Sequence, residues 1–401
     1  MVMAQSRPVQ IVQPMLVIKE VFAAGYRSLR HIRFPVEPLS VFVGANGTGK
    51  TNLYRSLQLL QSAAAGTFTH DLAAEGGFDS VYWAGQRGAK EPVRVKLGVR
   101  LSAGAGGDYN LDYTIETGLV QAAGGTVLGA GFRLEPQIKA ETLVYEARQR
   151  AKRLLDRQGP RGHCLDEEGL KRPLGSEILP SETALNSLQD AAAFPDLHLA
   201  RRTMLEWRFF HDFRTDAGSS LRRPCLAVTS PTLASDGSNL AAVFATLAHI
   251  REDTLELDQA FDDAFPGARL VIPEPDRFAD FGVIFPDYPK RVFQPSELSD
   301  GTLHFLALAG ALLSYRLAPF IALNEPETSL HPDLLEPLAR MIVAASKRTQ
   351  VWLVTHSEPL AEAIARHGGV SPRRVVKRKG ETWIDGLRLS GDFAEEDSED
   401  A

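Results

Sequence analysis

One short segment near the N-terminal end constrains the fold of this 401-residue chain more than any other feature. It reads Gly44-Ala45-Asn46-Gly47-Thr48-Gly49-Lys50-Thr51 and matches the pattern G-x-x-x-x-G-K-[ST] at every fixed position. The apolar residues 39–43 before it predict a strand, and leucines at helical spacing after it predict a helix. Glycines in such a loop let backbone N–H groups surround a phosphate at the start of the helix. The segment, extended to Asn52, therefore predicts a binding site for ATP.

Two side chains at the end of this segment carry its chemistry. Lys50 is expected to bridge the β- and γ-phosphates, and the Thr51 hydroxyl is expected to ligate Mg²⁺. A glycine-rich turn without a ligand is the alternative explanation, but a chance match with both flanking elements in place is rare at ordinary glycine usage. ATP and Mg²⁺ are therefore the predicted cofactors.

A second apolar strand, predicted over residues 320–323, ends in Asn324 and Glu325. Such an ending is typical of the Walker B position, whose first residue supports Mg²⁺ and whose second orients or deprotonates the attacking water. Asn324 stands where aspartate is usual, and its amide oxygen can accept a hydrogen bond but brings no negative charge. We therefore expect Glu325 to be catalytic and Asn324 to contribute to a weakened magnesium site.

Two further segments are weak signals when each is taken alone. Ser299, Asp300 and Gly301 open a predicted helix, and serine and aspartate are ordinary N-cap residues. His356 follows a strand predicted over residues 350–355, and a histidine at a strand end is more often structural. Their spacing adds weight, because Ser299 precedes Asn324 by 25 residues and His356 follows it by 32.

With all four segments in this order, the chain resembles the ABC-type ATPase heads of the RecF, SMC and OLD-like group, in particular the small AAA-type ATPases called AAA_21. The resemblance is carried by residues 44–52, 299–302, 323–332 and 355–357. It implies a homodimer that sandwiches two ATP molecules. In that dimer Ser299, Asp300 and Gly301 of one subunit would contact the ATP held by the other.

The same resemblance implies roles for individual residues. The catalytic residues would be Glu325, Lys50 and His356, the last as the switch histidine that contacts the γ-phosphate. Magnesium would be held by Thr51, Asn324 and a glutamine ahead of the insertion in the head. Gln86 is the nearest candidate for that glutamine, because it follows the strand-like residues 81–83.

The pattern along the chain predicts an α/β fold: a P-loop NTPase with an ABC-ATPase-like head, an antiparallel β subdomain and an inserted helical lobe. Apolar residues alternate with polar ones at 93–101 and 111–119, which predicts antiparallel strands with one solvent-exposed face. Leu143, Ala147, Ala151 and Leu154 are spaced for one face of a helix, and the Gly- and Ala-rich residues 62–89 predict a loop. The predicted parts are a loose leader (1–14), the first part of the head (15–139), a mainly helical insertion (140–224), the second part of the head (225–391) and an acidic tail (392–401).

Charge and composition exclude several classes of protein. The formal net charge is −6, but residues 392–401 hold six acidic side chains, and the remaining 44 balance 44 basic ones. The two cysteines have no disulfide or zinc spacing, which favours a reducing compartment. The longest apolar run, residues 305–313, is too short to span a membrane. We therefore expect a cytoplasmic protein without a membrane partner.

The partner of the ATPase stays open at this point. Residues 148–161, 201–223 and 373–379 are rich in arginine and lysine, so they could contact DNA, although charge runs are usually solvated faces. One function is an ATPase that acts on DNA or a partner protein in repair, recombination or phage defence. The other is a nucleotide-gated binding module in which Asn324 slows hydrolysis. Only 45 residues follow His356, so we expect any nuclease or effector to be a separate polypeptide.

Overall fold

The computed structural model describes residues 16–83, 85–86, 92–104, 108–119, 132, 134–148 and 150–393. The predicted leader (1–14) and residues 394–401 of the predicted acidic tail lie outside the described residues. Among the helices that the structure describes, none has the length and apolar character needed to span a membrane.

A six-stranded sheet with the order β10-β15-β16-β3-β17-β18 forms the centre of the molecule. Its strands are β10 (Arg208–Phe210), β15 (Phe320–Asn324), β16 (Gln350–Thr355), β3 (Leu39–Val43), β17 (Arg373–Arg378) and β18 (Glu381–Ile384). The first five strands run parallel, and β18 returns antiparallel to β17. Strands β3, β15 and β16 are buried along their whole length, which explains why they are mostly apolar in the sequence. The strands predicted at these three places are confirmed.

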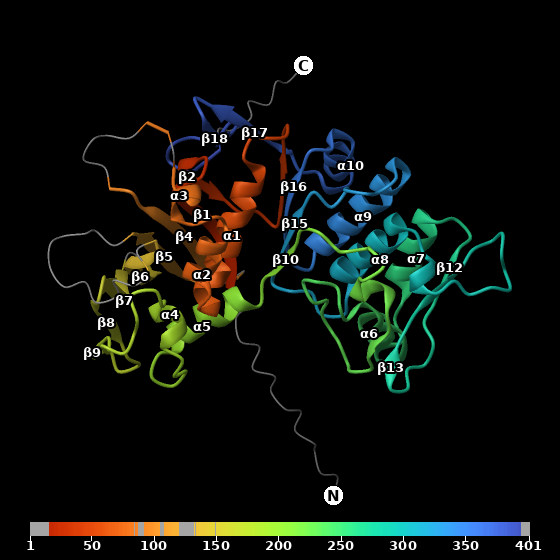
Figure 1. Cartoon of the computed structure of the whole chain (residues 1–401), viewed down its shortest axis with the longest axis horizontal. Helices are drawn as coiled ribbons and strands as arrows, with labels where there is room; N and C mark the ends of the chain where they lie inside the picture. The colour runs from red at the N-terminus through yellow and green to blue at the C-terminus, as the bar shows by residue number, and fades with distance from the viewer. Residues whose placement is uncertain are drawn as a thin grey trace, which may run out of the picture.

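Alternate residues of the central strands face two different hydrophobic cores. Phe42 and Trp352 belong to the core shared with α1, whereas Val41 and Leu353 belong to the core on the opposite face. The helices of these two cores are α1 (Lys50–Ala65) on one side, and α6 (Leu240–Ala245), α7 (Leu255–Ala264), α8 (Asp300–Leu313), α9 (Leu335–Ser346) and α10 (Glu358–Gly368) on the other. Figure 1 shows α1 at the left of the central strands and α7, α8 and α9 at their right.

The α1 core is closed by an eight-stranded antiparallel sheet with the order β2-β1-β4-β5-β6-β7-β8-β9. The strands are β1 (Leu16–Tyr26), β2 (Leu29–Pro35), β4 (Val95–Ala103), β5 (Tyr109–Gly118), β6 (Gln137–Ala147), β7 (Arg150–Gln158), β8 (Arg161–Leu165) and β9 (Lys171–Pro173). Leu97 and Leu101 on β4 are fully buried, while Lys96, the neighbour that precedes Leu97, points to the other face and is exposed. The predicted antiparallel sheet with one solvent-exposed face is confirmed.

The prediction of a mainly helical insertion over residues 140–224 is wrong in its first half. Residues 140–173 continue the antiparallel sheet as β6 to β9, and Leu143 pairs with Leu155 across β6 and β7. Apolar residues spaced by four also share one face of a strand, because four is a multiple of the two-residue strand period. The second half contains α4 (Ala184–Ser187), α5 (Pro195–Leu205), β10 and the 3₁₀ turn η1 (Ser220–Arg222). Helices α4 and α5 contribute buried residues to the α1 core, so they do not form a lobe of their own.

The described part of the loop predicted over residues 62–89 is largely helical. Helix α1 continues to Ala65, where Gly66 caps it in the left-handed conformation, and α2 (Phe68–Ala74) and α3 (Phe78–Val81) follow. The glycines of this region end short helices, and sequence periodicity cannot detect helices of four to seven residues. The remaining elements are β11 (Cys225–Leu226), η2 (Thr246–Arg251, a π-helix), β12 (Arg269–Val271), β13 (Phe278–Ala279), β14 (Gly282–Ile284), η3 (Pro295–Glu297) and η4 (Pro332–Leu334).

Candidate nucleotide-binding site

The segments singled out in the sequence meet at one edge of the parallel sheet. Thr355 pairs with Val43 and Asn324 pairs with Val354, so β3, β16 and β15 end at the same level. The N–H of Glu325 donates to the carbonyl of Val354 at 2.8 Å. The crevice beyond the carboxyl ends of parallel strands is the usual ligand position in α/β sheets. The loop after β3, the turn after β15 and the histidine after β16 therefore lie side by side.

The loop over residues 44–51, called the Walker A loop below, has the backbone of an anion cradle. Gly47 and Gly49 have φ values of 81° and 97°, a left-handed region that glycine enters without strain. A Cβ atom on Gly47 would meet nothing within 4 Å, so this side of the loop is open. The Nζ of Lys50 donates to the carbonyls of Gly44 at 2.6 Å and Ala45 at 3.0 Å, which places the ammonium inside the loop. The loop residues therefore fit a bound phosphate chain.

Two hairpins outside the motif hold this loop from behind. The hydroxyls of Ser28, in the β1–β2 turn, and Thr382, on β18, lie 2.6 Å apart. Thr382 Oγ1 donates to the carbonyl of Thr48 at 2.7 Å, and Asn52 Nδ2 donates to Ser28 Oγ at 2.7 Å. A Cβ atom on Gly49 would lie 1.8 Å from Thr382 Oγ1. No sequence motif marks Ser28 or Thr382, because only tertiary contact brings them to the loop.

The ammonium of Lys50 is buried and lies near two carboxylates. Burial lowers the pKa of Lys50, and the negative charges of Glu325 and Glu327 oppose this shift. A cation that is poorly solvated gains more from an approaching anion than a cation in water does. Lys50 is therefore placed to attract phosphate oxygens rather than to form a surface ion pair.

The two glutamates of the Walker B turn have different surroundings. Glu327 is 8% exposed, and its Oε1 accepts hydrogen bonds from Thr355 Oγ1 at 2.5 Å and from the His356 N–H at 3.0 Å. Glu325 has a left-handed φ of 51° and a half-buried side chain, with Oε2 lying 3.7 Å from His356 Nδ1. Strained backbone of this kind gathers at functional positions. Glu327 thus holds the ends of β15 and β16 together, whereas Glu325 takes no part in those bonds and lies beside His356.

The end of β15 offers oxygen atoms of the kind that Mg²⁺ prefers. Asn324 is 2% exposed, and its Nδ2 donates to Nδ1 of His211, the residue after β10. Its Oδ1 is buried and has no hydrogen-bond partner within the ranges described above. Thr51, in the first turn of α1, is exposed. Because Mg²⁺ is commonly held by one or two protein groups together with substrate phosphates, this amide oxygen and this hydroxyl fit the ion.

Residues 299–301, called the signature segment below, open helix α8 and are held by an arginine. Ser299 is the N-cap, and its Oγ accepts from the N–H of Thr302 at 3.2 Å. Asp300 pairs with Arg222 at 2.7 Å, and the same guanidinium donates to the carbonyl of Leu298 at 2.8 Å. The Arg222 side chain is only 13% exposed. Arg222 therefore shapes the signature turn and is not part of an exposed basic surface, contrary to its place in the basic stretch 201–223.

Helix α8 also touches the turn that follows Walker B. A Cβ atom on Gly301 would lie 3.0 Å from the carbonyl of Ser329, which has a left-handed φ of 65°. The Nε2 of His304 donates to the carbonyl of Pro326 at 3.1 Å. Burial lowers the pKa of His304, so the ring is neutral at physiological pH. The signature helix and the Walker B turn are thus fixed to one another within one subunit.

The structure places Gln86 on the surface after α3. In the described part of the chain no hydrogen bond joins it to the Walker segments, and its role as a magnesium ligand stays a prediction. The position beside Asn324 is taken by His211, because β10 is the strand next to β15. Sequence reasoning missed His211 since β10 has only three residues and no recognisable pattern.

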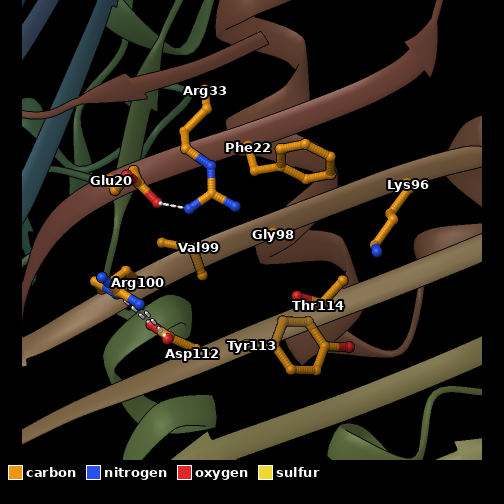
Figure 2. A pocket seen from close by; sticks show the side chains of 10 residues that line it. All are labelled: Glu20, Phe22, Arg33, Lys96, Gly98, Val99, Arg100, Asp112, Tyr113 and Thr114. Carbon is orange, nitrogen blue, oxygen red and sulfur yellow. Dashed lines mark hydrogen bonds and ion pairs between the residues drawn. The ribbon is translucent and has the colours of Figure 1, made fainter. Parts of the chain in front are cut away.

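A separate hollow of about 160 Å³ lies on the outer face of the antiparallel sheet. Figure 2 shows side chains of β1, β2, β4 and β5 around it, with Arg33 paired to Glu20 and Arg100 paired to Asp112, each at 2.7 Å. None of its lining residues belongs to the Walker or signature segments. Since its charges largely pair with one another, the hollow is a feature of the sheet surface and not part of the nucleotide site.

Comparisons of sequence place the chain among known proteins. The model of the AAA_21 family, described as "AAA domain, putative AbiEii toxin, Type IV TA system", matches residues 39–361. A chromosome partition protein Smc from Synechococcus sp. is 29% identical over 136 residues, which are 34% of this chain. The matched part is 10% of that protein, so the chain spans about a tenth of the length of this curated relative.

Two solved structures share the fold along nearly the whole chain. An Smc head bound to the C-terminal winged-helix domain of ScpA has a TM-score of 0.52 at 15% identity, covering 93% of this chain and 98% of that one. An Smc head with an extended coiled coil, bound to the C-terminal domain of ScpA derived from Pyrococcus furiosus, has a TM-score of 0.52 at 13% identity, covering 94% and 97%. These likenesses confirm the predicted α/β fold of a P-loop head with an antiparallel sheet. Since the family model also matches most of the chain, the chain belongs to the AAA_21 family and has a P-loop ATPase head of the ABC and SMC type.

Proposed function

We propose that this protein hydrolyses ATP as a homodimer in which two heads enclose two nucleotides. The observation that carries the proposal is the meeting of Lys50, Asn324, Glu325 and His356 at one edge of the parallel sheet. Membership of a P-loop ATPase family supports ATP as the substrate.

In this proposal each residue of the site has a distinct task. The Walker A loop and Lys50 bind the phosphates, and the oxygens of Thr51 and Asn324 hold Mg²⁺, which neutralises charge on the phosphate oxygens. Glu325 orients the attacking water and accepts its proton, a contribution of about 10²- to 10⁴-fold to the rate. His356 lies beside Glu325 and contacts the γ-phosphate from the neighbouring strand.

A second subunit completes the site. Ser299 and Asp300 are exposed at the N-terminus of α8, and within the described ranges no hydrogen bond or ion pair joins them to their own Walker A loop. The start of a 14-residue helix carries N–H donors and partial positive charge, both suited to a phosphate. In a two-fold dimer each signature helix would face the nucleotide of the other subunit.

Mixing two inactive variants tests this arrangement directly. Lys50→Ala removes the phosphate ligand, and Ser299→Arg blocks the signature, so each homodimer is expected to hydrolyse ATP at less than 1% of the wild-type rate, on the order of the loss of a key transition-state contact. A one-to-one mixture is expected to recover up to about a quarter of the wild-type rate, because half of randomly paired dimers are mixed and each of these has one intact site. A mixture as inactive as its components, with mixed dimers shown by pull-down, would contradict sites shared between subunits.

Asn324 favours a second candidate function, a nucleotide-gated binding module with slow hydrolysis. The amide lacks the negative charge that usually supports Mg²⁺ at this position. If the module is correct, the wild type binds ATP with turnover near the detection limit, and Asn324→Asp raises turnover by about tenfold or more. If the ATPase is correct, the wild type turns over at a rate typical of such enzymes, and Asn324→Asp changes it by less than about threefold. The rate of phosphate release by the wild type and by Asn324→Asp decides between the two functions.

The proposed target of the ATPase is a partner protein, such as a separate nuclease or effector in repair or phage defence, in the cytoplasm. Several arginines of the basic stretches are engaged: Arg148 with Asp108 at 2.6 Å, Arg153 with Asp156 at 2.9 Å and Arg374 with Glu358 at 2.9 Å. Arg157 is 2% exposed. These pairs weaken the case for DNA as the target. Retardation of duplex DNA at low salt, abolished at high salt, would restore it.

A further inference from the structure

His211, the residue after β10, has a contact that gives it a role in the site. Strand β10 runs parallel to β15, and Phe210 pairs with Leu323, so His211 and Asn324 reach the sheet edge together. Nδ2 of Asn324 donates to Nδ1 of His211, while Oδ1 of the same amide is buried without a partner in the described structure. We infer that His211 is a positioning residue that fixes the Asn324 amide with its oxygen free for Mg²⁺. This inference rests on the proposed function.

An asparagine at this place needs such a partner, whereas an aspartate does not. A carboxylate has two equivalent oxygens, and either of them can face a cation. An amide has one oxygen and one NH₂ group, so half a turn of the group presents hydrogen-bond donors to the cation. An imidazole that carries its proton on Nε2 accepts from the NH₂ group at Nδ1 and repels an oxygen placed there. In this tautomer His211 therefore selects the amide orientation that a metal site requires.

The imidazole is itself held against the helix that carries Lys50. The rings of His211 and Tyr54 have centroids 6.0 Å apart, and Tyr54 is 1% exposed. Tyr54 follows Lys50 by four residues, which puts both on the same face of α1. The ring that orients the Asn324 amide thus packs against the helix that carries Lys50 and Thr51.

The test measures how strongly Mg²⁺ improves nucleotide binding. Calorimetry on the full chain gives the affinity for the ATP analogue AMP-PNP in magnesium chloride and in EDTA, and the ratio of the two affinities is the quantity compared. His211→Phe keeps a ring but removes the acceptor, and it is expected to lower this ratio about 5- to 10-fold, the worth of one net hydrogen bond. His211→Asn places an amide oxygen near the former Nδ1 and is expected to restore the ratio to within about twofold.

A matched control and a second metal make the readout specific. His31→Phe makes the same replacement in the antiparallel sheet, where His31 is exposed and its ring centroid lies 5.1 Å from that of Phe22. This variant is expected to leave the ratio of the two affinities unchanged. Mn²⁺ in place of Mg²⁺, followed by electron paramagnetic resonance with AMP-PNP bound, reports metal affinity without turnover. His211→Phe is expected to lower that affinity by the same factor.

The Asn324→Asp background separates orientation of the amide from a general structural effect. Because either carboxylate oxygen can face the cation, His211→Phe is expected to change the ratio by less than about twofold in this background. An equal loss in both backgrounds, or no loss in the wild-type background, overturns the inference while leaving ATP binding intact. A wild-type chain that binds AMP-PNP in neither condition overturns the proposed function, and the inference falls with it.

Discussion

A Glu325→Gln variant is expected to lose ATP hydrolysis by at least about 100-fold while keeping its affinity for ATP. In the proposed mechanism the carboxylate orients the attacking water, and an amide cannot accept the proton of that water. The fold should not suffer, because the half-buried Glu325 side chain is not one of the groups that tie β15 to β16. Phosphate release and ATP binding are measured on the same preparation, and light scattering is expected to show the variant accumulating as an ATP-bound dimer.

Glu327→Gln is the matched control, because it removes the same charge two residues away. The Oε1 atom of Glu327 accepts hydrogen bonds from Thr355 and from the His356 N–H, and an amide oxygen can accept the same bonds. The bonds to an amide oxygen lack the strengthening that the carboxylate charge gives, so a loss of about 1–3 kcal/mol of stability is expected. Turnover is expected to fall by less than about tenfold. If Glu327→Gln loses turnover as fully as Glu325→Gln, the assignment of the catalytic role to Glu325 alone is contradicted.

A Gly49→Ala variant is expected to lose about 3–4 kcal/mol of stability and more than about tenfold in ATP affinity. At a φ of 97° any side chain is strained, and the new Cβ would lie 1.8 Å from Thr382 Oγ1 and 2.6 Å from Ser28 Oγ. These hydroxyls cannot simply turn away, because they are bonded to each other and to the Walker A loop. Urea unfolding and calorimetric titration with ATP measure the two effects.

Gly47→Ala provides the comparison within the same loop. Its φ of 81° imposes similar backbone strain, but its Cβ would meet no atom within 4 Å, so a loss of only about 1–2 kcal/mol is expected. Adding Thr382→Ala to Gly49→Ala removes the closest clash, and the double variant is expected to be more stable than the sum of the single effects predicts. Equal losses at Gly47 and Gly49 would show that the two hairpins do not hold the loop.

The sequence predicted the part of the fold that is coded by local pattern. The strands at Leu39–Val43 and Gln350–Thr355 are buried on both faces and therefore consist largely of apolar residues. The strands β4 and β5 alternate because one face of their sheet is exposed. The error over residues 140–173 arose where the pattern was ambiguous, because residues four apart lie on one face of both a helix and a strand. Pairing of β6 with β7 then decided the outcome.

Within the site the sequence identified residues that stand in a motif and missed those that reach it from elsewhere. Lys50, Glu325 and His356 occupy fixed places after three apolar strands, so their meeting at one edge follows once the strands are parallel neighbours. Position along the chain favours Gln86 as a magnesium ligand, whereas the residue that contacts Asn324 is His211. No local rule states which strand lies next to β15.

By itself the sequence determined that this chain holds a P-loop and a Walker B strand, because phosphate binding needs glycines, lysine and a strand-to-helix turn in fixed order. Only the tertiary structure decided what supports them: Ser28 and Thr382 behind the loop, Arg222 at the signature turn and His211 against Asn324. The physical reason is that these contacts join residues far apart in the chain, and the hydrogen bonds that define them exist only after the two sheets have packed on α1.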